Sequence, residues 1–196
     1  MNLLRLTIFL ALACAGVAEA TPITYLYSGS GTGSLGNVSF TNAEFLITAQ
    51  ADTSNITPWV NAGFGPQNTH LLTTIDIGGL GVHTINMPSH TWVVPDGSVG
   101  GLGENLYLNW VTLSESFLPG YGLDTAYGPV TDTTPWDVGQ FNSVNTTGGL
   151  LSFTSISTIT FEAILVPEPS AMPSVAGVGL LGCLWIRNGV RNRFNS

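Results

Sequence analysis

Basic side chains are nearly missing from this sequence of 196 residues, which contains no lysine and four arginines. The arginines lie close to the two ends of the chain, at Arg5, Arg187, Arg191 and Arg193. Of the twelve acidic residues only Glu19 and Glu168 lie outside residues 21–166, so this body carries ten carboxylates and a formal charge of −10. Nucleic acids and anionic membrane surfaces both attract clustered cations, and both are therefore excluded as direct partners of the body.

Cysteine is equally scarce, and Cys14 and Cys183 are the two that occur. Residues 21–166 therefore have no disulfide, no thiolate nucleophile and no cysteine ligand for a metal. A body of this length is long enough to form one domain with a proper hydrophobic core. We expect burial and backbone hydrogen bonds to stabilise it.

The first twenty residues have the layout of a secretory signal peptide. Arg5 precedes an apolar run over residues 6–13, and Ala18-Glu19-Ala20 matches an A-x-A cleavage site before Thr21. The apolar run is too short to span a bilayer stably as a helix. We expect the secretion translocon to export the chain and the segment 1–20 to be removed.

A second apolar segment, near the other end, is built differently. Val166-Pro167-Glu168-Pro169-Ser170 precedes the apolar residues 171–186, and Arg187, Arg191 and Arg193 follow. A helix over 171–186 would be about 24 Å long, shorter than a hydrocarbon core of about 30 Å. Pro173 shortens the usable helix further. The segment predicts one short hydrophobic helix that anchors the chain temporarily, with the arginines on the cytoplasmic side.

This order of Pro167-Glu168-Pro169, hydrophobic segment and terminal arginines resembles the sorting signal of the PEP-CTERM family of exported proteins. The resemblance covers residues 166–196, and the opening of the body, from Tyr27 through Asp52, is more loosely similar to ectodomains of that family. It implies a Gram-negative envelope, processing by an exosortase-type enzyme and an association with extracellular polysaccharide or biofilm matrix. Glu168 and its flanking prolines would then be recognition elements for the processing enzyme.

The body has many strand and turn patterns and almost no helical ones. Alternating apolar residues predict strands over 23–27, 38–40, 44–51, 71–77, 82–85, 92–94, 106–113 and 150–165. The glycine- and serine-rich segment 29–36 is interpreted as a turn region, and residues 114–149 as long loops. We therefore predict an all-β fold, a single antiparallel β-sandwich of jelly-roll type over 21–165, flanked by the signal peptide 1–20 and the sorting signal 166–196.

The three histidines, His70, His83 and His90, show no metal-ligand spacing such as H-E-x-x-H. His83 and His90 flank a predicted turn, so Asp76 or Asp96 could complete a zinc-like set with them. Strand-edge or loop positions are the preferred interpretation of all three histidines.

A catalytic pair is not evident either. Glu104 and Glu115 bracket a predicted strand and would be about 36 Å apart along a straight one, whereas glycosidases need carboxylates about 5–10 Å apart. Pairing of one of them with Asp124, Asp132 or Asp137 stays open. The sequence has no G-x-S-x-G elbow, and no serine has a base that the spacing pairs with it.

Two kinds of binding site remain as alternatives. Asp124, Asp132 and Asp137 lie in the predicted loop region, where calcium would relieve carboxylate repulsion, although no D-x-D-x-D-G loop is present. Trp59 and Trp136 each adjoin a proline in loop-like sequence and could stack on sugar rings, whereas Trp110 lies in a strand and is expected in the core.

The leading interpretation is a non-enzymatic surface or extracellular-matrix protein without a required cofactor. It would be sorted through its tail and then reside at the cell surface or outside the cell. The first alternative is a secreted carbohydrate-binding module that uses the loop tryptophans, with or without calcium. The second is a secreted hydrolase.

Overall fold

The computed structural model describes residues 20–58, 65–105, 108–114, 118–133 and 144–167. Within these ranges the secondary structure consists of β-strands joined by turns and loops, with no helix. The strands are β1 (Pro22–Leu35), β2 (Val38–Pro58), β3 (Pro66–Ile77), β4 (Gly81–Thr84), β5 (His90–Val93), β6 (Val99–Asn105), β7 (Leu108–Ser114), β8 (Tyr127–Asp132), β9 (Val144–Thr146) and β10 (Gly149–Leu165). The all-β prediction is confirmed.

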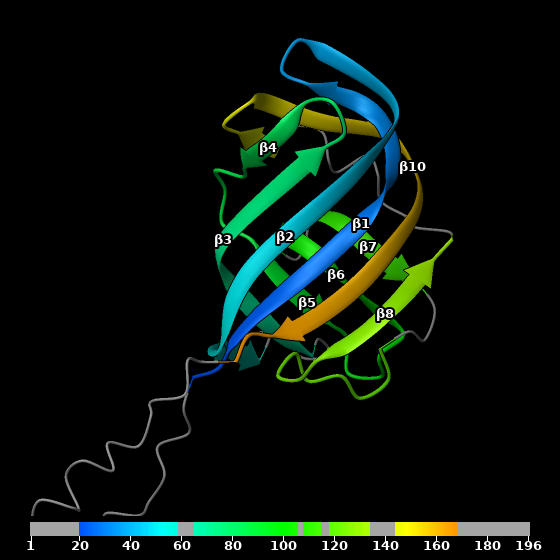
Figure 1. The fold of residues 1–196 in the computed structure, drawn as a ribbon. Helices are drawn as coiled ribbons and strands as arrows, with labels where there is room; N and C mark the ends of the chain where they lie inside the picture. Colours follow the sequence, from blue (N-terminus) through cyan, green and yellow to red (C-terminus); the bar gives the residue numbers. More distant parts are fainter. Residues whose placement is uncertain (1–19, 59–64, 106–107, 115–117, 134–143, 168–196) are drawn as a thin grey trace, which may run out of the picture. The chain divides into compact units, whose positions relative to one another are not determined.

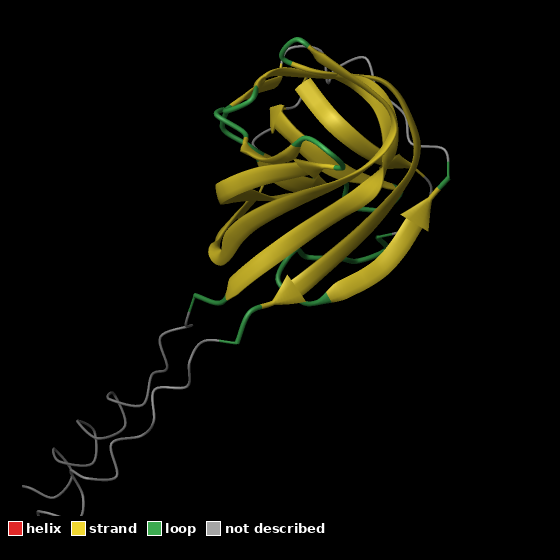
Figure 2. Ribbon diagram, turned by 45° about the horizontal axis from the view of Figure 1, so that its top comes forward, coloured by secondary structure: helices red, strands yellow, loops and turns green. Residues whose placement is uncertain are grey.

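All ten strands belong to one antiparallel sheet with the order β7-β6-β5-β3-β2-β1-β10-β8, in which β4 pairs with β3 and β9 with β10. The sheet curls, so that β5, β6 and β7 lie behind β1, β2 and β10 (Figures 1 and 2). The Tyr27 hydroxyl on β1 lies 2.9 Å from Thr91 Oγ1 on β5. This hydrogen bond joins the two halves of the curled sheet, β5–β7 on one side and β1, β2 and β10 on the other, across the interior. Burial between these halves provides the core.

Apolar residues alternate along the long strands as the sequence predicts. On β2 the inward side chains are those of Phe45, Ile47, Ala49 and Ala51, all buried, while Leu46 points outward and is 39% exposed. On β10 the inward positions include Ile159, Phe161 and Ala163. The intervening residues of both strands form the outer face of the curled sheet.

The glycine-rich segment 29–36 is not a turn region, as the sequence suggested, because β1 continues through it to Leu35. A Cβ at Gly31 would lie 2.7 Å from the Phe153 ring, and one at Gly33 would lie 2.9 Å from the Phe40 ring. Aromatic rings from the neighbouring strands thus fill the space above these glycines. Glycine is required here for close packing inside a strand, a role that composition alone does not reveal.

Substitution of Gly31 by alanine tests this packing. The new methyl group would meet both the Phe153 ring and the Ser155 carbonyl oxygen, the latter at 2.8 Å. We expect the free energy of unfolding, measured by urea denaturation, to fall by about 1–3 kcal/mol. Gly78→Ala is the matched control, because its nearest neighbour would be Glu44 O at 3.4 Å. A loss as large in the control as in Gly31→Ala would contradict the packing argument.

The predicted loop region 114–149 also needs correction. It contains the strands β8 and β9, which pair with opposite ends of β10. The buried residues Leu118, Tyr121 and Leu123 lie between β7 and β8 and belong to the core. β8 contains Gly128, Pro129 and Asp132, and β9 is three residues long, so neither shows a clear period that the pattern could reveal.

Candidate functional site

The outer face carries two rows of mostly polar residues, one of which crosses β3, β2, β1 and β10 and the other β2, β1 and β10. In the first row Asp76 pairs with Leu46, Leu46 with Ser28, and Ser28 with Thr160. In the second row Glu44 pairs with Ser30, and Ser30 with Thr158. We call the hollow that these seven residues line the outer groove.

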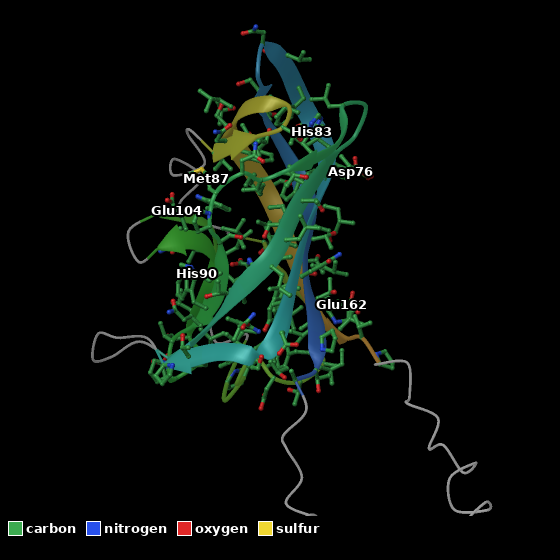
Figure 3. The ribbon with its side chains drawn as sticks, turned by 90° about the vertical axis from the view of Figure 1, so that its left-hand side faces the viewer. Asp76, His83, Met87, His90, Glu104 and Glu162 are labelled. Carbon is green, nitrogen blue, oxygen red and sulfur yellow. The ribbon has the colours of Figure 1, made fainter. Side chains whose placement is uncertain are left out.

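The outer groove is open and has a volume of about 580 Å³. Four strands spaced about 4.8 Å apart give it a length of about 14 Å across the sheet. Hydroxyl groups line its β1–β10 half, and the carboxylates of Glu44 and Asp76 line its β2–β3 half. Glu162 is on the same outer face one row further along β10, and Figure 3 shows Asp76 and Glu162 on the same side of the sheet.

Hydroxyl pairs continue beyond the rows. Ser30 Oγ lies 2.7 Å from Ser157 Oγ, and Thr160 Oγ1 lies 2.8 Å from Thr131 Oγ1 on β8. Each hydroxyl in such a pair keeps lone-pair capacity for a further partner. The sequence signal for this surface was the polar set of each alternating strand, but only the strand register shows which of those residues share a row.

The interior holds a second polar cluster, which is centred on His70 of β3. His70 Nδ1 is 2.9 Å from Ser89 Oγ, and His70 Nε2 is 3.0 Å from Thr91 Oγ1. Thr91 Oγ1 contacts the Tyr27 hydroxyl, which donates to the Gly101 carbonyl at 3.3 Å. The cluster therefore links β1, β3, β5 and β6.

The direction of these hydrogen bonds determines the tautomer of His70. The Gly101 carbonyl can only accept, so the Tyr27 proton is used there and Thr91 must donate to Tyr27. Thr91 then has no second proton, so His70 Nε2 carries the hydrogen that it receives. In the neutral ring Nδ1 is consequently an acceptor, with Ser89 Oγ at 2.9 Å and Thr73 Oγ1 at 3.3 Å as its neighbours.

Burial favours the neutral form of His70 and His90. His70 is half-buried as a residue, but both its ring nitrogens are enclosed by the cluster, and burial lowers its pKa to about 3, with a further contribution from His90. Burial also lowers the pKa of His90 to about 4. Burial raises the pKa of Tyr27 far above its usual value of about 10, so its hydroxyl remains a donor.

The structure corrects two expectations about these residues. His70 faces the interior instead of lying at a strand edge or in a loop, and Ser89 does have a neighbouring base. The pair nevertheless lacks the features of a nucleophilic site, because Ser89 is 4% exposed and the other nitrogen of His70 contacts a threonine where a triad has a carboxylate. The cluster serves to join strands.

The zinc-like set proposed for His83, His90, Asp76 and Asp96 is not assembled. His83 pairs with the inward residue Ile75, whereas the neighbouring Asp76 points outward. Figure 3 shows His83 near the Asp76 end of β3 and His90 far below it. Asp96 Oδ1 accepts from the Ser98 amide at 2.9 Å and from the Ser98 hydroxyl, and these hydrogen bonds lower its pKa.

The predicted acidic sites are only partly described. Asp124 is exposed in the segment between β7 and β8, and Asp132 is buried at the end of β8, while Asp137 lies outside the described residues. Glu104 lies near the end of β6, and Glu115 is also outside the described residues. No group of three or more His, Cys, Asp or Glu side chains within the described ranges is arranged to hold a metal ion.

The structure likewise describes only some of the residues named in the tryptophan and sorting predictions. Trp110 is 2% exposed and Trp92 is 4% exposed, which confirms the core position of Trp110, while Trp59 and Trp136 lie outside the described residues. Ala20, Thr21, Val166 and Pro167 are described; Ala18, Glu168, Pro169, Ser170 and the arginines Arg187, Arg191 and Arg193 are not. In the part of the chain that the structure describes, no helix has the length and apolar character needed to cross a membrane.

No family model, curated protein or solved structure is significantly similar to this chain.

Proposed function

We propose that this chain is an exported, non-enzymatic protein of the cell surface or extracellular matrix that is processed at both ends. In this proposal the curled sheet serves as a jelly-roll-like sandwich whose two halves form the layers. A short hydrophobic helix within 171–186 holds the precursor in the membrane until an exosortase-type enzyme acts at Pro167-Glu168-Pro169. The mature protein then associates with extracellular polysaccharide.

The observation that carries this proposal is the position of the two ends of the domain. Ile23 at the start of β1 pairs with Leu165 at the end of β10, and the Val166 amide donates to the Pro22 carbonyl at 2.9 Å. Both predicted processing sites, after Ala20 and near Pro167, therefore adjoin one end of the sheet (Figure 1). The β1–β2 turn at Gly36 lies at the opposite end, so a domain tethered at its processing sites would present that end outward.

Composition supports the same conclusion. The body has no Lys or Arg, no Cys and a formal charge of −10, which suits an extracellular domain that stays soluble through charge repulsion. The outer face adds rows of small hydroxyl side chains, a surface that can form many weak hydrogen bonds with a hydrated polymer.

Intact mass spectrometry of the protein recovered separately from membranes and culture medium tests the proposal. We expect a product that begins at Thr21 and ends between Pro167 and Ser170, free or with a glycan-like adduct. The control is a variant with Pro167 and Pro169 replaced by alanine, which should remain uncleaved at the C-terminal side and stay with the membrane. A native product that still ends at Ser196 in the membrane fraction would contradict sorting by cleavage.

A further inference from the structure

We propose that the outer groove binds a cationic polysaccharide, a chain of amino sugars with free ammonium groups. This inference deepens the proposed function, because it assigns to the exported domain a class of matrix polymer and the surface that holds it. The groove lies on the flank of the sheet and is independent of the two processing sites.

The shape of the groove suits a polymer. It crosses four strands over about 14 Å and is open to solvent, and the sheet continues past it into β4 beside Asp76 and into β8 beside Thr160. A small ligand would instead require a pocket that encloses most of its surface. The floor is continuous sheet, because Ser28 pairs directly with both Leu46 and Thr160.

The polar groups of the groove divide into two kinds that match the two kinds of group on an amino sugar. Ser28 and Thr158 offer hydroxyls that donate and accept, and Ser30, whose proton is used toward Ser157, keeps acceptor capacity; both kinds of group suit sugar hydroxyls. Glu44 and Asp76 are exposed carboxylates that only accept, which suits an ammonium group. They occupy diagonal positions on adjacent strands, since Leu46, two residues from Glu44, pairs with Asp76.

Charge decides between classes of polymer. No Lys or Arg exists between residues 6 and 186 to neutralise Glu44 or Asp76, and the body carries a formal charge of −10. An anionic polysaccharide would therefore be repelled, whereas a cationic one is attracted at long range and neutralised at the groove. A basic peptide such as polylysine would satisfy the carboxylates but carries no side-chain hydroxyls to pair with the hydroxyl half of the groove.

Calorimetric titration of the full-length chain, purified in a nonionic detergent, tests the proposal. The probe is a glucosamine hexamer at about pH 6, where its amines are largely protonated. For Glu44→Gln combined with Asp76→Asn we expect about tenfold weaker binding, from the loss of two solvent-exposed charge contacts. Asp76→Asn alone should weaken binding more than Asp124→Asn, which removes a carboxylate that is also exposed but lies away from the groove.

Three comparisons can overturn the assignment. Unchanged affinity in the double variant would remove the groove as the site, provided that circular dichroism shows both proteins equally folded. Equal affinity for the N-acetylated hexamer would show that ammonium groups are not recognised. Equal affinity for hexalysine would show that the sugar is not recognised. Binding is measured on the purified chain, so its result does not depend on whether the chain is cleaved in the cell. A protein that is not cleaved but binds the hexamer would contradict only the proposed processing.

Discussion

Replacement of Phe161 by alanine is expected to lower the free energy of unfolding by about 3–5 kcal/mol. The Phe161 ring is 1% exposed and lies on β10, the strand that pairs with both β1 and β8. Its centroid is 5.1 Å from that of Tyr27, 6.3 Å from that of Tyr25 and 6.2 Å from that of Tyr121. Its removal would leave a cavity among three rings that belong to β1 and to the segment before β8.

The cost should be large because neighbouring rings cannot move in to fill the cavity. The hydroxyl of Tyr25 donates to the Leu123 carbonyl at 2.7 Å and accepts from Asn68 Nδ2 at 2.8 Å, and the hydroxyl of Tyr27 is held by the His70 cluster. Collapse toward the cavity would break these buried hydrogen bonds, each of which leaves an unsatisfied polar group. The Phe161→Leu variant, which keeps much of the volume, should lose less stability.

Urea denaturation monitored by tryptophan fluorescence provides the measurement. Ile164→Ala is the matched control, because it also truncates an apolar side chain of β10, but one that is 41% exposed on the outer face. We expect the control to change stability by less than about 1 kcal/mol. Similar losses in Phe161→Ala and Ile164→Ala would show that the two faces of β10 are not distinguished as inner and outer.

The contrast between these two positions was predictable from the sequence, because residues 159, 161 and 163 alternate with polar ones. The same holds for Phe45, Ile47 and Ala49 on β2. Periodicity identifies the inward face of a long strand, because the polarity of each residue reflects whether its side chain faces the core or the solvent. It also accounts for the successful prediction of an all-β fold.

Features that depend on contacts between distant strands were not predictable. Gly31 belongs to a strand because Phe153, 122 residues later in the chain, covers it. His70 faces inward through an irregularity in pairing with β2, where Gln50 pairs with Leu72 and Ala51 with His70. The outer groove requires three registers at once, so its rows of hydroxyls and carboxylates become visible only when the strands are aligned.

Acidification should destabilise the protein strongly, because the folded chain buries two neutral histidines. His70 and His90 have folded-state pKa values of about 3 and about 4, below the value of about 6.5 expected in the unfolded chain. At pH values between the folded-state and unfolded-state pKa, the unfolded chain binds more protons than the folded one. The stability that the two neutral histidines contribute is therefore complete above about pH 6.5 and is lost as the pH falls. Each histidine then costs up to about 1.4 kcal/mol per pH unit.

We therefore expect the chain to be about 4 kcal/mol less stable at pH 5 than at pH 7.5, as measured by urea denaturation at the two pH values. His70→Gln and His90→Gln should each be less stable than the parent at neutral pH, but each should show about half of the parent's pH dependence between pH 5 and 6. The double variant should show little pH dependence in that window.

The comparison of slopes separates titration from packing, because a packing defect lowers stability equally at every pH. A parent protein equally stable at pH 5 and pH 7.5 would mean that both rings accept protons while folded, and the enclosed His70 cluster that joins β1, β3, β5 and β6 could not then hold.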